Sequence, residues 1–210
     1  MAKKQNGAAN VAPSALLAAL STALAYPADG IDSALAPLRA CAKSPSCARY
    51  ASSIEAVLNT VSAFTAPGVA QPHGAEAAQL EYTRLFIGSF KMYAPPYASY
   101  YLDGEHQVQG PTTVEVASLY DQFGVELGET EHDCADHIRY LLAFTSLLAR
   151  TYEERGQAEF VDAYRDFVGL YVLRWAPEFA RLVDDYAEFP LYPALVRLVI
   201  EVLSEEGSDA

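Results

Sequence analysis

The chain has 210 residues, of which 51% are hydrophobic and 11% aromatic, and its formal net charge is −13. This length fits one domain, and the apolar content excludes disorder of the whole chain, because disordered chains lack the apolar surface that offsets ordering entropy. Residues 105–210 hold 21 Asp and Glu against 7 Arg and contain no Lys. Such an acidic field repels phosphate backbones and favours a basic partner, so we expect no nucleic-acid partner. The alternative explanation of the charge is solubility alone.

The three cysteines, Cys41, Cys47 and Cys134, include no CxxC pair. An odd number without such a pair argues against a disulfide framework and against a structural zinc site. Of the four histidines, His132 and His137 stand five residues apart, off the spacing that places two ligands on one helical face. We therefore expect reduced thiols and no metal site.

The N-terminal region imitates a secretory signal, because Lys3-Lys4 precedes an alanine-rich run at 15–25. Ser and Thr dilute that run, and small or polar residues separate it from the lysines. We therefore expect a flexible tail over 1–13 and a first helix opened by Ser14. No stretch approaches the ~20 apolar residues that span a bilayer, so no integral membrane segment is expected.

Helical periodicity dominates the rest of the chain, since apolar residues recur at steps of three and four and so share one helical face. Gly124 and Gly156 stand where C-terminal caps belong, Pro177 suits a first turn, and Thr112 or Thr113 suits an N-terminal cap. No convincing pair of strands is present. The predicted fold is all-α, a single-domain helical bundle of about nine helices over 1–210, with helices that include 47–65, 75–90, 112–124, 133–155, 160–171, 177–186 and 191–202.

Residues 88–111 interrupt this pattern with a long aromatic and Pro-rich loop that contains Tyr93, Tyr97, Tyr100 and Tyr101. Unstructured connections longer than about 12–15 residues are uncommon in compact domains and are usually functional or disordered. This segment is too aromatic for disorder. We expect it to pack onto the bundle and to line a binding surface.

Asp136-His137 is expected in the first turn of the predicted helix 133–155, and three interpretations stay open. Asp136 caps the helix beside a half-buried structural histidine, or the pair anchors a ligand or a loop, or His137 is a general base oriented by a carboxylate. Adjacent helix positions point about 100° apart, which disfavours a side-by-side dyad. Trp175, the only tryptophan, is expected in the core or in the wall of an aromatic groove.

A composite pattern over roughly residues 76–200 resembles the TorD/DmsD family of redox-enzyme maturation chaperones. Its parts are Glu81-Tyr82-Thr83-Arg84-Leu85-Phe86-Ile87-Gly88, then Tyr93-Ala94-Pro95-Pro96-Tyr97-Ala98-Ser99-Tyr100-Tyr101, then Asp136-His137-Ile138, and finally Trp175-x-Pro177-x-Phe179. By this resemblance, the expected peptide-binding residues are Tyr82, Leu85, Phe86, Pro95, Pro96, Tyr97, Ser99, Tyr101, Asp136, His137 and Trp175.

The resemblance implies a cytoplasmic chaperone rather than an enzyme, without a cofactor of its own. Its partners would be the catalytic subunit of a molybdopterin-dependent oxidoreductase and the twin-arginine signal peptide of that subunit. The chaperone would assist cofactor insertion and hold back export until maturation is complete. Weak guanine-nucleotide binding and a monomer or domain-swapped dimer are also implied. The alternatives are a nucleotide hydrolase that uses Asp136 and His137, and an assembly factor that binds only the mature client.

Overall fold

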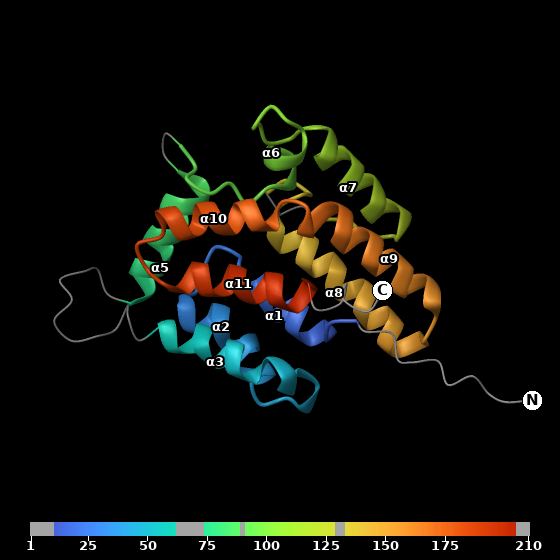
Figure 1. Cartoon of the computed structure of the whole chain (residues 1–210), viewed down its shortest axis with the longest axis horizontal. Helices are drawn as coiled ribbons and strands as arrows, with labels where there is room; N and C mark the ends of the chain where they lie inside the picture. Colours follow the sequence, from blue (N-terminus) through green and yellow to red (C-terminus); the bar gives the residue numbers. More distant parts are fainter. Residues whose placement is uncertain (1–10, 62–73, 89–90, 129–132, 205–210) are drawn as a thin grey trace, which may run out of the picture.

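The computed structural model describes residues 11–61, 74–88, 91–128 and 133–204 (Figure 1). Within these ranges it contains ten α-helices and no strand, which confirms the all-α prediction, with one helix more than the nine expected. The helices are α1 (Ser14–Ala23), α2 (Ile31–Cys41), α3 (Ala51–Thr60), α5 (Gly74–Tyr82), α6 (Ala98–Leu102), α7 (Pro111–Gln122), α8 (Ile138–Arg155), α9 (Ala158–Val168), α10 (Ala176–Tyr186) and α11 (Leu191–Ser204). None of the helices described is long and apolar enough to cross a membrane.

Three short segments have other helical geometry. A 3-10 helix, Pro45–Tyr50, leads into α3, and π-helical turns occupy Thr83–Ile87 and Gly169–Leu173. Each π turn extends an α-helix, α5 in the first case and α9 in the second. π-helical turns are rare and occur often at functional sites. Both lie next to the aromatic residues discussed below.

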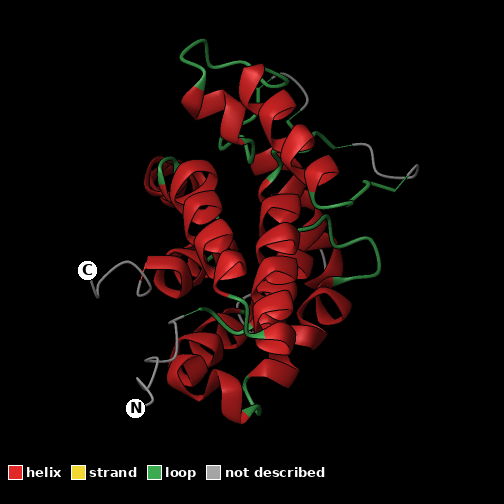
Figure 2. Ribbon diagram, turned by 90° about the vertical axis from the view of Figure 1, so that its right-hand side faces the viewer, coloured by secondary structure: helices red, strands yellow, loops and turns green. Residues whose placement is uncertain are grey.

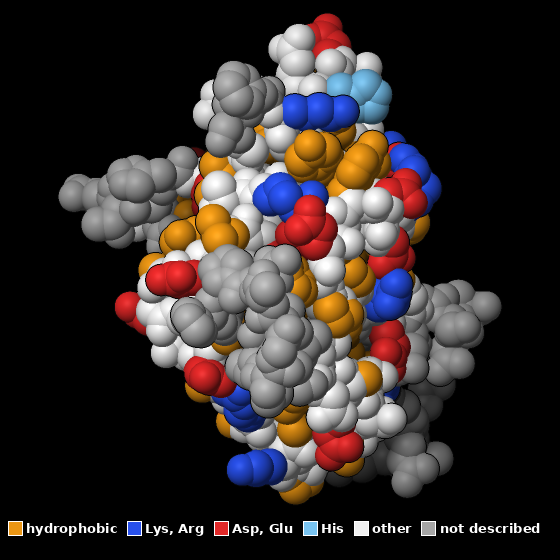
Figure 3. All heavy atoms as spheres, turned by 90° about the vertical axis from the view of Figure 1, so that its left-hand side faces the viewer, with side chains coloured by type: hydrophobic (Ala, Val, Ile, Leu, Met, Phe, Trp, Pro, Cys, Tyr) orange, Lys and Arg blue, Asp and Glu red, His pale blue; other side chains and the backbone are white. Residues whose placement is uncertain are grey.

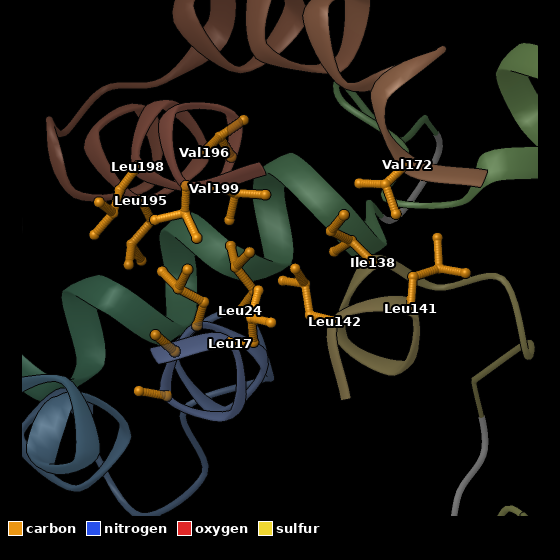
Figure 4. Packing of buried hydrophobic residues seen from close by; sticks show 14 of the residues in the cluster. Leu17, Leu24, Ile138, Leu141, Leu142, Val172, Leu195, Val196, Leu198 and Val199 are labelled. Carbon is orange, nitrogen blue, oxygen red and sulfur yellow. The ribbon is translucent and has the colours of Figure 1, made fainter. Parts of the chain in front are cut away.

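The core forms where α1 packs between α8 and α2 and also touches α11. Leu16, Leu17 and Leu20 of α1 are completely buried. Figure 4 shows Leu17 directed toward Leu142 of α8 and toward the apolar face of α11. Figure 2 shows the resulting layers of helices from the side. Ala12 and Leu203 belong to one cluster of buried side chains, so both ends of the described chain contribute to a single core.

Several predicted helix bounds are correct. Gly156 ends α8 with a φ of +66°, the left-handed conformation that suits glycine at a C-terminal cap. Pro177 stands in the first turn of α10, where its missing N–H costs nothing. Helix α1 begins at Ser14, as expected. The predicted tail over 1–13 lies mostly outside the described residues.

Other bounds were predicted wrongly. Helix α8 begins at Ile138 rather than at 133, because the preceding residues pair with a distant segment. Helix α7 begins at Pro111 after Gly110, and neither Thr112 nor Thr113 is its N-cap. The predicted loop 88–111 contains α6, and the predicted helix 75–90 changes to π geometry after Tyr82. Helix α2, which accommodates Pro37, was not predicted.

Replacing Leu17 with Ala tests the contact between α1 and α8. The variant should lose about 2–5 kcal/mol of unfolding free energy, because a fully buried leucine leaves a cavity when truncated. Urea denaturation followed by circular dichroism measures this loss. Ala18→Ser, at an exposed position of the same helix, should change stability by less than about 0.5 kcal/mol. Equal effects of the two variants would contradict the packing.

Candidate functional site

The aromatic segment is fixed to the start of α8 by a short antiparallel backbone contact. The Ala98 N–H donates to the carbonyl of Asp136 at 3.1 Å, and the Ile138 N–H donates to the carbonyl of Pro96 at 2.8 Å. Tyr97 and His137 face each other as an isolated β-bridge. The two segments are about forty residues apart in sequence, so this contact joins two halves of the candidate site.

Asp136 uses its side chain to hold two further helices. Its buried carboxylate accepts from the Ser99 N–H at 2.7 Å and from the Thr113 hydroxyl at 2.8 Å. Ser99 lies in the first turn of α6, where a carboxylate satisfies a free N–H and faces the positive end of the helix. Asp136 therefore caps α6. The interpretation that it caps its own helix was wrong.

His137 is the N-cap of α8. Its Nδ1 accepts from the Arg139 N–H at 3.1 Å, so the proton of the neutral ring sits on Nε2, which lies 3.5 Å from the Tyr82 hydroxyl. Burial, with a smaller contribution from the charge of Arg139, lowers the pKa of His137 to about 3. General-base catalysis favours a pKa near the working pH and a reachable ring. At 1% exposure this side chain is structural and not half-buried as expected.

A chain of ring contacts connects most of the remaining predicted residues. The Tyr82 ring contacts Phe86 at 4.9 Å, and Phe86 contacts Phe179 at 5.9 Å. Trp175 follows, 5.4 Å from Phe179 and stacked on Tyr101 with ring centroids 5.1 Å apart. The Tyr101 hydroxyl then donates to the carbonyl of Pro95 at 2.9 Å, which closes the chain on the aromatic segment.

The structure thus brings the eleven predicted peptide-binding residues together, but places most of them in the interior. Only Tyr97 and Tyr101 are partly exposed. The other nine are buried, namely Tyr82, Leu85, Phe86, Pro95, Pro96, Ser99, Asp136, His137 and Trp175. Because buried side chains cannot touch a ligand, these nine form a frame in this conformation, and a direct role in peptide binding stays a prediction.

Glu81 belongs to this frame although it was not among the predicted site residues. Its buried carboxylate accepts from the N–H groups of Glu188 and Phe189 at 2.7 and 3.4 Å and pairs with Arg84 at 2.8 Å. It fixes the turn between α10 and α11. The sequence signal that could have identified Glu81 is a glutamate within an otherwise apolar helical stripe. Such a carboxylate must be paired or hydrogen-bonded when it is buried.

The face beside the frame mixes aromatic and charged side chains. The Tyr93 ring packs on Tyr186 at 5.0 Å, and the Arg84 guanidinium lies 5.6 Å from the Tyr93 centroid. Leu80 and Ile87 are exposed on the same helical stretch. Figure 3 shows hydrophobic and charged side chains interspersed on this side of the molecule. Charged groups lie among the apolar side chains that this view shows.

Replacing Asp136 with Asn tests the frame. The amide keeps the shape but loses the charge, and its donating NH2 group replaces one of the two oxygens that accept from Ser99 and Thr113. The variant should lose about 1.5–3 kcal/mol of unfolding free energy, the range for hydrogen bonds to charged groups. Asp121→Asn, at an exposed position of α7, is the matched control. A loss no larger than that of the control would contradict the role of Asp136.

The low pKa of His137 makes stability depend on pH in a known direction. The folded protein resists protonation while the unfolded chain takes up a proton near pH 6.5, so this contribution is complete above pH 6.5 and is lost as pH falls toward 3. Between pH 6.5 and 5 the unfolding free energy should therefore fall, by at most about 1.4 kcal/mol per pH unit. His137→Asn should show a shallower slope in urea titrations, and an unchanged slope would contradict the buried neutral ring.

Comparison with known proteins identifies the family that the chain matches and several of its relatives. Residues 44–181 match the family model described as nitrate reductase delta subunit. Over 136 residues the chain is 29% identical to the chaperone protein TorD of Aliivibrio salmonicida, which covers 61% of this chain and 63% of that relative. Over 133 residues it is 27% identical to the Tat proofreading chaperone DmsD of Salmonella typhi, covering 63% and 62% respectively. The chain thus matches about three-fifths of the length of these relatives.

A solved structure from Archaeoglobus fulgidus, described as that of a redox enzyme maturation protein, superimposes with a TM-score of 0.58 at 25% identity. The superposition covers 91% of this chain and 93% of that one. It therefore includes the N-terminal helices, which the sequence pattern did not reach. By the family match over more than half of its length, this chain belongs to the family described as nitrate reductase delta subunit, and the relatives that it resembles include chaperones named TorD and DmsD.

Proposed function

We propose that this protein is a cytoplasmic chaperone for the catalytic subunit of a molybdopterin-dependent oxidoreductase. It binds the twin-arginine signal peptide and the apoprotein, assists cofactor insertion and delays export until the cofactor is in place. The names of its relatives support this role, since one is a TorD chaperone and another a Tat proofreading chaperone. Weak guanine-nucleotide binding and the oligomeric state, a monomer or a domain-swapped dimer, stay predictions from the resemblance.

One observation favours a binding role over catalysis. Asp136 and His137 are the pair that a hydrolase would use, and both are buried, with the Asp136 carboxylate bonded to α6 and α7 and the His137 ring bonded to the Arg139 N–H. A general base must reach the proton that it removes, directly or through one water. The pair instead stabilises the frame that positions the surrounding surface. This arrangement suits a module that recognises a polypeptide.

The chemistry of the proposed ligand matches the surface of the chain. A twin-arginine signal peptide offers two guanidinium groups and an apolar stretch. Guanidinium groups form bidentate, charge-assisted bonds with carboxylates, and exposed carboxylates are numerous among the described residues of 105–210. Tyr97 and Tyr101, the two predicted residues that are partly exposed, are one candidate contact, because aromatic rings with a polar end suit varied peptides at low entropic cost. A micromolar affinity, about −8 kcal/mol, is expected for a peptide that must become ordered on binding.

Isothermal titration calorimetry with a twin-arginine signal peptide tests the proposal. The peptide should bind with a dissociation constant near or below about 1 μM, and a peptide with both arginines replaced by lysine should bind more weakly. The lysine peptide is the sharper control, since it keeps the charge and removes only the bidentate geometry. Equal binding of both peptides, or no heat with signal peptides from several molybdoenzymes, would contradict recognition of the signal peptide.

A further inference from the structure

A groove lies between α7 and α9, with α8 as its floor, away from the buried frame. Its volume is about 280 Å³. Figure 2 looks onto the side of the molecule where α8 ends and α9 begins. The lining is almost entirely apolar and consists mainly of Leu119, Phe123, Phe144, Leu148, Phe167 and Leu170.

The groove exposes large apolar side chains at its edges. Phe123 is 40% exposed at the end of α7, and Leu170 is 49% exposed in the π turn that follows α9. The floor below them is aromatic, since Phe144 contacts Phe123 at 5.4 Å and Phe167 at 4.7 Å. Single exposed apolar residues are ordinary, whereas two large ones at the edges of one apolar hollow indicate an interaction site.

Acidic side chains border this groove on both sides. On α9, Glu159, Asp162 and Asp166 are exposed at spacings of three and four, and Asp166 lines the groove itself. On α7, the carboxylate of Glu115 accepts from the hydroxyl of Tyr171, another lining residue, at 3.5 Å. Together α7 and α9 carry five acidic residues and one basic residue, Arg165. The rim is therefore negative around an apolar centre.

The size and charge of the groove restrict what can occupy it. Its volume lies just below the roughly 300–1,000 Å³ of small-molecule sites, which suits a few aliphatic side chains better than a cofactor. The acidic rim repels anionic lipid and nucleic acid. A second copy of the chain in a twofold dimer would place the same acidic rim against itself. A peptide segment with apolar side chains and adjacent arginines matches both the apolar centre and the acidic rim of the groove.

We propose that this groove binds the twin-arginine signal peptide, an inference that rests on the proposed function. Aliphatic side chains of the peptide fill the hollow over Phe144 and Phe167, in the manner of an amphipathic segment bound in a groove. The two guanidinium groups pair with the carboxylates of Asp162 and Asp166. The buried frame keeps α7 in position, since the Thr113 hydroxyl donates to Asp136.

Leu170→Asp tests the apolar contact, with Leu80→Asp as the matched control. Both leucines are exposed, at 49% and 57%, and Leu80 lies on α5 outside the groove. In fluorescence anisotropy with a labelled signal peptide, Leu170→Asp should weaken binding by about tenfold or more, as loss of a central apolar anchor does. Leu80→Asp should leave affinity within about twofold. Thermal unfolding of both variants confirms that the fold is intact.

The charge contact is tested by a pair of double variants with the same change in net charge. Asp162→Asn with Asp166→Asn neutralises the rim, whereas Glu55→Gln with Glu105→Gln neutralises exposed carboxylates elsewhere. The rim variant should lose affinity for the twin-arginine peptide but not for the peptide in which alanine replaces both arginines. Equal losses in the two double variants would show only a general field effect and would overturn the assignment.

The outcomes separate this inference from the proposed function. If wild-type protein binds the peptide and all groove variants bind equally well, the groove is the wrong site and the proposed function stands. If Tyr97→Ala removes binding and the groove variants do not, the peptide contacts the aromatic segment. This outcome overturns the groove assignment too. If wild-type protein binds no signal peptide, both proposals fail.

Discussion

The carboxylate of Asp136 is the interaction on which the central part of the molecule depends. Burying a charge costs several kcal/mol unless hydrogen bonds compensate it, and here the N–H of Ser99 and the hydroxyl of Thr113 supply that compensation. The same residue offers its carbonyl to Ala98. One side chain and its backbone thereby fix α6, α7 and the start of α8 relative to one another. The aromatic residues of 93–101 take their positions from this contact.

The sequence predicted those elements whose own residues specify them. Helices α10 and α11 follow from apolar stripes, and Pro177 and Gly156 mark ends that local backbone chemistry determines. The sequence-based prediction failed where contacts with residues distant in sequence determine the end of a helix. Thr112 or Thr113 was expected to cap its own helix, but Thr112 bonds the carboxylate of Asp103 and Thr113 that of Asp136. Helix α8 begins late because Ile138 donates to Pro96, a contact that no periodicity records.

The candidate site was predicted as a set of residues but not as a geometry. The residue types of the family pattern do assemble, yet burial of Trp175 and His137 makes them structural parts of a frame. The groove between α7 and α9 was not visible in the sequence for a different reason. Its lining comes from three helices, and the exposure of Phe123 and Leu170 depends on their packing, whereas periodicity alone places such residues in the core.

Hydrogen–deuterium exchange with and without bound signal peptide tests the central claim, that a buried frame supports binding on a separate surface. The backbone N–H groups of Ala98, Ser99 and Ile138 are hydrogen-bonded within the frame and should exchange slowly in both states. Added protection should appear in α7, in α9 and in the turn that contains Leu170. Loss of protection at Ala98, Ser99 and Ile138 on binding would contradict the account, since it would show that the frame opens to contact the peptide itself.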